Sequence, residues 1–357
     1  MMEKMEYSYV SNVCCDMLNI RYEKVFEFEF LAIVRSVEKL YNDNLIADYK
    51  FYEQYGASDY RHNLRIQTGL SSEGAIFIGW HHNSAKPNEQ MLYDMKVELN
   101  PSKQNYLTDH SDGYSKTEFI NDIEIYKIIA PILDKKVCRV IEFDIAIDLP
   151  YKMAHVLSIP LKGRNMNLVQ GTRYYGQKHK DMYLKIYDKA KERKEKTGID
   201  VGTDLTRLEF SIRPANGNGL TFTALERYLI DLDKYYLIAL YTDVLSDINV
   251  RSHIYSILSG YLQFSEFNHR QKKKIVETIE NELTKLSINQ IISNNWINIL
   301  TPISEWCFES VDDKTLEDFM ERFKYNQCEQ YEHYVTIQKD KQVIHTYSQH
   351  FKEKKNK

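Results

Sequence analysis

The chain has 357 residues, a formal net charge of −4, and 43% hydrophobic and 27% charged residues, an ordinary balance for a globular protein. This length is enough for at least one full hydrophobic core and favours two domains. The acidic balance argues against a protein that coats nucleic acid indiscriminately, although it leaves room for a local basic site. No stretch is apolar enough for a signal peptide or a membrane span, so we expect a cytoplasmic protein with no membrane partner.

The cysteines and histidines give no sign of a metal centre. The five cysteines are scattered without CxxC spacing, which argues against both a disulfide framework and a zinc site. His81 and His82 are the one adjacent histidine pair, and neighbours on a strand point to opposite faces. Any metal would therefore need other ligands.

The first two hundred residues alternate between strand and helix patterns. In chain order, the patterns predict a strand over 15–24, a helix over 30–42, strands over 60–69, 74–82 and 91–100, a helix over 117–133, a strand over 138–150, a hairpin over 172–176 and 182–187, a helix over 188–196 and a strand over 205–213. The turn-forming residues between the strands over 74–82 and 91–100 predict an antiparallel pair.

The composition changes at PANGNG, residues 214–219, which is the densest cluster of turn-forming residues in the chain. Helical patterns follow over 224–245, 271–286 and 312–324. The sequence therefore predicts an α+β domain over residues 1–215 and a mainly helical domain over residues 220–357.

Four of the predicted strands carry a polar face opposite an apolar one, because successive strand residues point to opposite sides. The polar faces hold Lys96 and Glu98; Glu142, Asp144 and Asp148; Tyr183, Lys185 and Tyr187; and Arg207 and Glu209. On the strand over 138–150, Val140 breaks the polarity. If the four strands are neighbours in one sheet, the carboxylates and Tyr187 can cluster on it.

Such a cluster would suit phosphate chemistry. Two or three carboxylates favour Mg²⁺ or Mn²⁺ over zinc, and an ion of this kind neutralises phosphate oxygens. The ion and neighbouring lysines would also activate a tyrosine hydroxyl, whose ordinary pKa is near 10. The same pattern is also compatible with strands whose charged faces are simply solvated.

Four ordered motifs resemble the Rep_trans replication initiation factors, which are rolling-circle plasmid initiators of Gram-positive bacteria related to the relaxases of conjugative elements. The motifs are MKVELNP (95–101), EFDIAID (142–148), GTRYYG…DMYLKIYDKAKER (171–193) and LTRLEFSIR (205–213). The resemblance implies a nickase-like catalytic domain with a central, mostly antiparallel sheet and helices packed on one face.

The resemblance also implies a chemistry, which is site-specific nicking of single-stranded or extruded DNA. Tyr187, in LKIYDK, occupies the position of the nucleophile that forms a 5′-phosphotyrosyl link and frees a 3′-hydroxyl. Glu98, Asp144, Asp148 and Glu209 fit the acidic positions for Mg²⁺ or Mn²⁺. Strand parity favours Glu98, Asp144 and Glu209, with Asp148 as a substitute ligand or as a residue that supports the ligands from behind.

Further residues are candidates for contacts with DNA. Lys185 and Lys189 flank Tyr187 and are expected to contact the phosphate, whereas Arg173 and Arg207 are alternatives that could instead pair with carboxylates. Tyr183 is expected to stack on an unpaired base. In the helical domain, a basic cluster predicts phosphate contacts with duplex origin DNA, although a solvated helix face explains it equally well. That cluster is Arg270, Lys272, Lys273 and Lys274.

Two other functions stay open. A metal-dependent nuclease that activates water would keep the carboxylates and dispense with Tyr187. A DNA-binding replication protein without catalysis would need neither. The resemblance further implies a homodimer and a host helicase as partners.

Overall fold

The structure is a computed structural model of the whole chain. It describes residues 10–307 except for 54–59, 69–73, 83–92, 107–119, 121, 134–135, 162–163, 178–181, 199, 201, 226–230 and 241–244. Residues Met1–Ser310 form one compact unit, and the second unit, Val311–Lys357, lies outside the described residues. The helix predicted over 312–324 therefore lies outside them as well.

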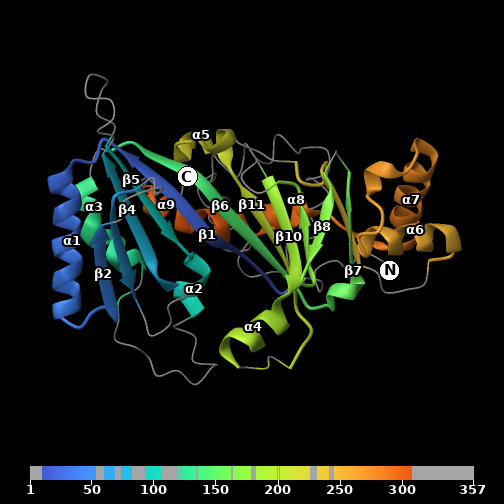
Figure 1. Cartoon of the computed structure of the whole chain (residues 1–357), viewed down its shortest axis with the longest axis horizontal. Helices are drawn as coiled ribbons and strands as arrows, with labels where there is room; N and C mark the ends of the chain where they lie inside the picture. Colours follow the sequence, from blue (N-terminus) through green and yellow to red (C-terminus); the bar gives the residue numbers. More distant parts are fainter. Residues whose placement is uncertain are drawn as a thin grey trace, which may run out of the picture. The chain divides into compact units, whose positions relative to one another are not determined.

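A ten-stranded sheet in which all paired neighbours run antiparallel forms the centre of the fold (Figure 1). Its strands are β1 (Asn12–Glu23), β2 (Asp48–Glu53), β3 (His62–Gln67), β4 (Ile76–His82), β5 (Tyr93–Leu99), β6 (Cys138–Leu149), β8 (Met166–Val169), β9 (Thr172–Tyr175), β10 (Met182–Asp188) and β11 (Thr206–Ile212). Their order is β2-β3-β4-β5-β1-β6-β11-β10-β9-β8. The predicted α+β class and the predominantly antiparallel sheet are confirmed.

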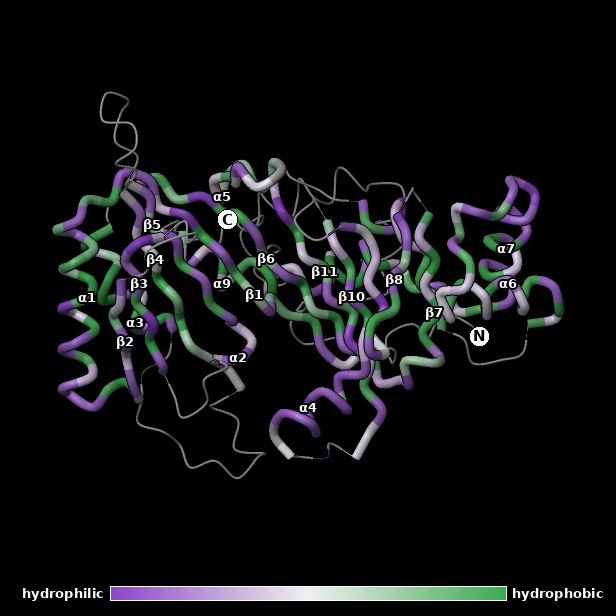
Figure 2. The backbone as a smooth tube through the Cα atoms, viewed as in Figure 1, coloured by the Kyte–Doolittle hydropathy of each residue, from purple (hydrophilic) through white to green (hydrophobic). Residues whose placement is uncertain are grey.

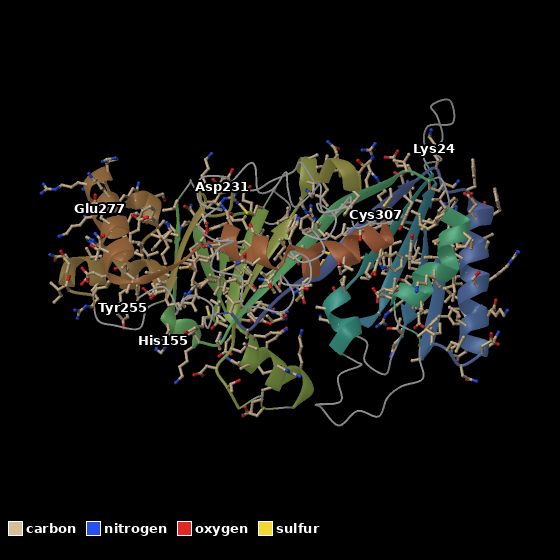
Figure 3. The ribbon with its side chains drawn as sticks, turned by 180° about the vertical axis from the view of Figure 1, so that it is seen from behind. Lys24, His155, Asp231, Tyr255, Glu277 and Cys307 are labelled. Carbon is tan, nitrogen blue, oxygen red and sulfur yellow. The ribbon has the colours of Figure 1, made fainter. Side chains whose placement is uncertain are left out.

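The apolar face of the sheet is buried by helices. Helix α1 (Glu27–Asn42) buries Phe30, Ile33, Val37 and Leu40, contacts β2 and packs on α3 (Asp122–Leu133). Helix α9 (Trp296–Trp306) contacts both β1 and α3, and Figure 3 shows it crossing the strands.

The C-terminal end of α9 is tied directly to the centre of the sheet. On β1, the buried Tyr22 donates its hydroxyl proton to the carbonyl of Trp306. The two residues are 284 positions apart in the sequence. The sheet core therefore includes residues from beyond the predicted domain boundary.

Two short helices lie at the ends of strands. Helix α2 (Pro101–Tyr106) contacts β1, and helix α4 (Lys189–Thr197) follows β10 and contacts β11. Figure 2 shows α4 as an almost entirely hydrophilic helix. Asp188 caps its first turn by accepting a hydrogen bond from the Lys191 amide at 2.8 Å, and Gly198 ends it with a positive φ of 74°.

The pairing of β1 with β6 contains two irregularities. The register shifts between Cys15 and Met17, so Asp16 is an extra residue on β1. A second shift pairs Asn19 with Glu142 and Ile20 with Val140, which leaves Ile141 extra on β6. This second shift explains why Val140 breaks the alternation of polar residues along that strand.

A smaller three-stranded sheet and a helix pair form a second core. The sheet has the order β13-β12-β7, with β7 at Val156–Pro160, β12 at Tyr236–Leu240 and β13 at Thr284–Leu286. Helices α6 (Ile248–Leu258) and α7 (His269–Glu282) pack on each other. Residues from β7, β12 and both helices share one hydrophobic cluster. Helix α5 (Phe222–Leu225), helix α8 (Ile288–Asn294) and short 3₁₀ turns at Met153–His155, Pro214–Gly217 and Phe264–Glu266 complete the described elements.

This region corrects part of the predicted helical domain. The helix predicted over 224–245 is wrong at Tyr236–Leu240, which is the buried strand β12. The segment YYLIAL is apolar throughout, and a short apolar run does not distinguish a strand from a helix. Similarly, the helix predicted over 271–286 ends at Glu282 and gives way to β13. The compact unit also continues through residues 214–219, where we predicted a boundary.

Candidate functional site

The polar residues of β1, β6, β11 and β10 meet on one face of the sheet, because the strands are direct neighbours in register. Tyr187 faces Arg207, which in turn faces Asp148. Two residues away on the same face, Lys185 faces Glu209. Two residues further along, Tyr183 faces Ser211, Ser211 faces Asp144, and Asp144 faces Met17 of β1. We call this surface the polar face. The sequence prediction that Tyr187, Asp144 and Glu209 lie on one face is confirmed.

Tyr187 lies at the end of β10, immediately before the capping residue of α4. Its hydroxyl donates a hydrogen bond to Oε2 of Glu209 at 3.2 Å. Lys185 forms an ion pair with Oε1 of the same carboxylate, which is therefore shared by two donors. The ammonium of Lys189 lies 5.8 Å from the centre of the Tyr187 ring and 2.6 Å from Glu192 Oε2.

The charges around Tyr187 and its burial disfavour the ionised form of its hydroxyl. Burial and the negative charge of Glu209 raise the pKa of Tyr187 well above its ordinary value, and the charge of Arg207 opposes them only in part. Although burial disfavours the charge on Lys185, its pairing with Glu209 raises the pKa of the ammonium. A reaction at the Tyr187 oxygen therefore needs a proton acceptor in contact with it.

Arg207 is the centre of a buried ion-pair network. Its Nε and Nη2 donate to the two oxygens of Asp148 at 2.7 and 2.8 Å, and its Nη1 donates to Asp16 at 3.0 Å. Ser102 of α2 also donates to Asp16, at 2.6 Å. Burial works against the charge of Arg207, but its hydrogen bonds to Asp148 and the charges of Asp16 and Asp148 raise its pKa.

This network bears on two of the predicted residues. The nitrogens of Arg207 are directed at carboxylates, which is the alternative that the sequence left open for this residue. Both oxygens of Asp148 accept hydrogen bonds from Arg207. Strand alternation could not reveal Asp16, because this residue occupies the irregular position in β1.

Asp144 is the least satisfied carboxylate of the polar face. The residue is 6% exposed, and its Oδ1 has no hydrogen-bond partner within the described part of the chain. Burial and the nearby charge of Glu209 raise the pKa of Asp144 to about 8, whereas a hydrogen bond from Ser211 acts in the opposite direction. An unpartnered buried carboxylate oxygen is the kind of group that a bound cation satisfies.

Glu98 does not join the other predicted metal ligands. It lies on β5, which β1 and β6 separate from Glu209 on β11. Three strand spacings amount to about 14 Å. The carboxylate of Glu98 instead pairs with Lys96 at 2.7 Å. Among the described residues, no group of three or more histidines, cysteines, aspartates or glutamates is arranged to hold a metal. The predicted set of Glu98, Asp144 and Glu209 therefore does not converge.

The other predicted DNA contacts of the sheet have different surroundings. Arg173 is buried and donates to the carbonyls of Val156 at 2.7 Å and Met153 at 3.2 Å, so it joins β9 to the β7 region rather than facing DNA. Tyr183 is half-buried and stacks on Tyr174, with ring centres 5.9 Å apart.

The basic cluster lies in the first turns of α7. Arg270 is exposed, and Lys273 is exposed with a weak pairing to Glu277 at 3.6 Å. Lys272 donates to the Ser265 carbonyl at 2.7 Å, and Lys274 pairs with Asp247. Two of the four side chains therefore already have close partners within the protein.

Comparisons with known proteins found little. No family model and no curated protein sequence matches the chain. Four solved chains match, among them the "Structure of Rolling Circle Replication Initiator Protein from Geobacillus stearothermophilus". That match has 15% sequence identity and a TM-score of 0.33, and it covers 71% of this chain and 97% of the other. A TM-score this low does not establish a shared fold, so the function of the site has to be argued from its own residues.

Proposed function

We propose that this protein nicks and rejoins DNA through a covalent bond between Tyr187 and a 5′-phosphate, as its resemblance to replication initiation factors implies. The observation that carries the proposal is the contact between the Tyr187 hydroxyl and Glu209 Oε2. That contact gives the tyrosine a nearby proton acceptor, which its raised pKa requires. In this role the protein would initiate rolling-circle replication or conjugative transfer.

The proposed step is an in-line transesterification. The Tyr187 oxygen attacks the scissile phosphorus, and its proton passes to Glu209. The bond from phosphorus to the 3′-oxygen breaks, and the leaving oxygen takes a proton to become a free 3′-hydroxyl. The phosphotyrosine keeps the energy of the broken ester, so the reverse reaction rejoins the ends without another energy source.

Lysines would complete the phosphate-binding part of the site. Lys189 lies beside the Tyr187 ring and Lys185 binds the carboxylate that the tyrosine contacts. Both can offset charge on the phosphate oxygens as the new bond forms. Tyr183 and Tyr174 provide a stacked aromatic surface for an unpaired base on the same face.

We propose Asp144 and Glu209 as ligands of a divalent cation, which the unpartnered Oδ1 of Asp144 supports. Bound there, Mg²⁺ or Mn²⁺ would neutralise the non-bridging phosphate oxygens. We keep metal dependence as part of the proposal.

The test is the capture of a covalent adduct. Wild-type protein is incubated with Mn²⁺ and a library of single-stranded hairpin oligonucleotides that carry a randomised loop, and the products are separated on a denaturing gel. We expect a DNA–protein adduct with wild type and none with Tyr187→Phe. The matched control is Tyr183→Phe, on the same strand and face, which should still form the adduct.

Other outcomes would contradict the proposal. Cleavage without an adduct, equal in wild type and Tyr187→Phe, would indicate a nuclease that activates water. Binding without cleavage in every variant would indicate a DNA-binding protein without catalysis. Sequencing of the DNA recovered from an adduct would identify the nick site.

A further inference from the structure

An aromatic side chain on β4 points to the side of the sheet where alternation would place a polar residue. Alternate residues of β4 from Ile76 to Trp80 are buried in the core. Phe77 and Gly79 therefore point to the opposite side, where Phe77 is half-buried. A residue that breaks the local pattern in this way often has a function other than packing in the main core.

The register shows that this side of β4 continues the polar face. Asn19 of β1 faces Glu142 of the polar face on one strand and Glu98 of β5 on the other. Glu98 faces Phe77, which in turn faces Arg65 of β3. Side chains directly opposite each other in neighbouring strands point to the same side. Because β4 lies five strand spacings from β10, Phe77 is about 24 Å along the sheet from that strand.

Tyr60, which precedes β3, packs on Gly79 beside Phe77. A Cβ atom on Gly79 would lie 2.9 Å from Cγ of Tyr60 and 3.2 Å from Cε1 of Phe77. The absence of a side chain at position 79 therefore lets both rings approach the strand. The Tyr60 ring also meets the ring of His81 edge to face, with centres 6.2 Å apart. Both Tyr60 and Phe77 are half-buried, so part of this aromatic surface is open to solvent.

An exposed cation lies next to the aromatic surface. Arg65 faces Phe77 from β3, and its side chain is exposed. Within the described part of the chain, its guanidinium has no acidic partner. On the other side of Phe77 lies Glu98, whose negative charge is offset by Lys96 at 2.7 Å. A phosphate beside Arg65 would therefore meet a positive charge that is not already neutralised by these neighbours.

Helix α1 covers the other side of this part of the sheet. Phe51 of β2 contacts Phe30 of α1, with ring centres 6.2 Å apart, and faces Leu64 of β3. Leu64 and Arg65 are neighbours on β3 and point to opposite sides. Exposed residues of α1 can therefore serve as controls that belong to the same part of the molecule but not to the same surface as Phe77.

We infer that Tyr60, Phe77 and Arg65 form a further binding surface for single-stranded DNA, in which bases stack on the two rings and the guanidinium contacts a phosphate. We call these three residues the aromatic platform. Aromatic rings beside cations hold unpaired strands without strict sequence preference, because every base has a flat face and every nucleotide has a phosphate. A duplex does not fit this arrangement, since its paired bases do not expose their faces.

The inference rests on the proposed function for the choice of DNA as the ligand. It adds that an unpaired strand that crosses the polar face from β10 is held again about 24 Å away, on β3 and β4. Such a second contact would keep the strand in place on the sheet while the bond at Tyr187 is broken and rejoined.

The experiment measures the binding of a fluorescein-labelled single strand without self-complementary segments to the full-length protein by fluorescence anisotropy. Every protein in the series carries Tyr187→Phe, so binding is measured without nicking. Phe77→Leu keeps an apolar side chain but removes the ring, and it should weaken binding about fivefold or more, as expected when one base loses its stacking partner. Phe77→Tyr keeps the ring and should bind like the parent.

Arg65→Ala tests the phosphate contact. The slope of log K against log [salt] should become shallower by about 0.7, which corresponds to one phosphate contact with a single strand. Circular dichroism establishes that each variant is folded. Because Arg65 is exposed, its variant tests the platform even if Phe77→Leu does not fold.

The matched controls repeat both chemical changes on α1. Phe28 is 70% exposed and Arg35 is exposed on that helix. Phe28→Leu should leave the affinity unchanged, and Arg35→Ala should leave the salt slope unchanged. Folded platform variants that bind like these controls would overturn the inference, and so would a parent protein that binds no single strand.

The failure of this inference can be told apart from the failure of the proposed function. If the platform variants weaken binding while protein with Tyr187 intact forms no adduct, the platform stands and the nicking function fails. If wild type forms the adduct while Phe77→Leu and Arg65→Ala bind like the parent, the nicking function stands and the platform fails.

Discussion

Arg207 and Glu209 are two residues apart on β11, and both are buried. The guanidinium of Arg207 is held by Asp148 and Asp16, whereas the carboxylate of Glu209 is shared between Lys185 and Tyr187. A carboxylate with two exchangeable donors can accept a proton or a cation, whereas each of the three nitrogens of the Arg207 guanidinium already donates to a carboxylate. We therefore assign Arg207 a positioning role beside Tyr187.

Removing the guanidinium of Arg207 should destabilise the folded protein. Arg207→Met leaves two buried carboxylates without a counter-charge, and we expect the free energy of unfolding to fall by about 3–5 kcal/mol. Urea denaturation at neutral pH measures it. Arg213→Met on the neighbouring segment is the control, because its pair with Glu142 is more exposed and its loss should cost clearly less. If both variants lower the free energy of unfolding equally, the buried Arg207 network stabilises the fold no more than the Arg213–Glu142 pair does.

For single residues, the sequence correctly predicted those positions that depend only on the alternation of side chains along a strand. Tyr187, Lys185 and Glu209 lie on regular strands, so the alternation of side chains correctly placed them on one face of the sheet. Asp16 is the extra residue at the first register shift of β1 and Asn19 lies between the two shifts, so their faces depend on an irregularity that alternation does not reveal. Glu98 failed for another reason, since parity fixes the face of a residue and not the number of strands between two residues.

At the scale of elements, α7 has its basic side chains at an unfavourable end. Arg270 and Lys272 to Lys274 lie in its first turns, where the helix dipole disfavours positive charge by about 0.3–1 kcal/mol per residue. The capping box of Asn268 and Gln271 and the pair between Lys274 and Asp247 offset part of this cost. A phosphate backbone would offset the rest.

Neutralising the exposed members of the cluster should change the salt dependence of duplex binding. The double variant Arg270→Ala, Lys273→Ala removes two phosphate contacts, so the slope of log K against log [salt] should become shallower by about 2. Fluorescence anisotropy between 50 and 300 mM salt would measure the slope. Lys274→Ala should have a smaller effect because of its pair with Asp247, and Lys50→Ala, exposed on β2, should have none. A slope that does not change in the double variant would remove α7 from the DNA interface.

Elements with regular periodicity were predicted well, and short apolar ones were not. Helices α1, α3 and α4 and the strands of the polar face agree with their patterns to within a few residues. Strand β12 was predicted as helix because its partners lie far away in the sequence. Ile238 pairs with Ser158 of β7, 80 residues away, and with Leu286 of β13, 48 residues away. Pairing with such distant segments is a tertiary property that no local window contains.

At the scale of the whole described molecule, no helix is long and apolar enough to cross a membrane. The contact of α9 with β1 and α3 joins the last described residues to the first strands of the sheet. Two acidic residues belong to these two helices, Asp122 to α3 and Glu305 to α9. Asp122 at the start of α3 is buried, and burial raises its pKa to about 6, while burial and the charge of Asp122 raise the pKa of Glu305 on α9.

This arrangement predicts a dependence of stability on pH. Because the folded state holds the Asp122 proton more tightly than the unfolded state does, its contribution is fully present below about pH 4 and is lost as the pH rises through about 6. The loss amounts to about 3 kcal/mol. In Asp122→Asn, the difference in the free energy of unfolding between pH 4 and pH 8 should therefore shift by about this amount in favour of pH 8. Urea denaturation across that range measures it, with Asp48→Asn, exposed on β2, as the control for net charge. An identical pH profile in wild type and Asp122→Asn would contradict the assignment.

The extra residue Asp16 has a consequence for evolution. Inward-pointing residues of β1 are Val13 and Cys15 before it and Leu18, Ile20 and Tyr22 after it, so the strand changes parity at this point. Deleting a single residue here would exchange the two faces of one half of the strand. Either Asn12 and Cys14 would turn inward, or Asn19 would turn inward and leave the polar face. A relative that has lost this residue should therefore also have lost the charge network of Arg207 or the amide at position 19. In an alignment of such relatives, a one-residue gap in β1 would mark a rebuilt site rather than a neutral length change.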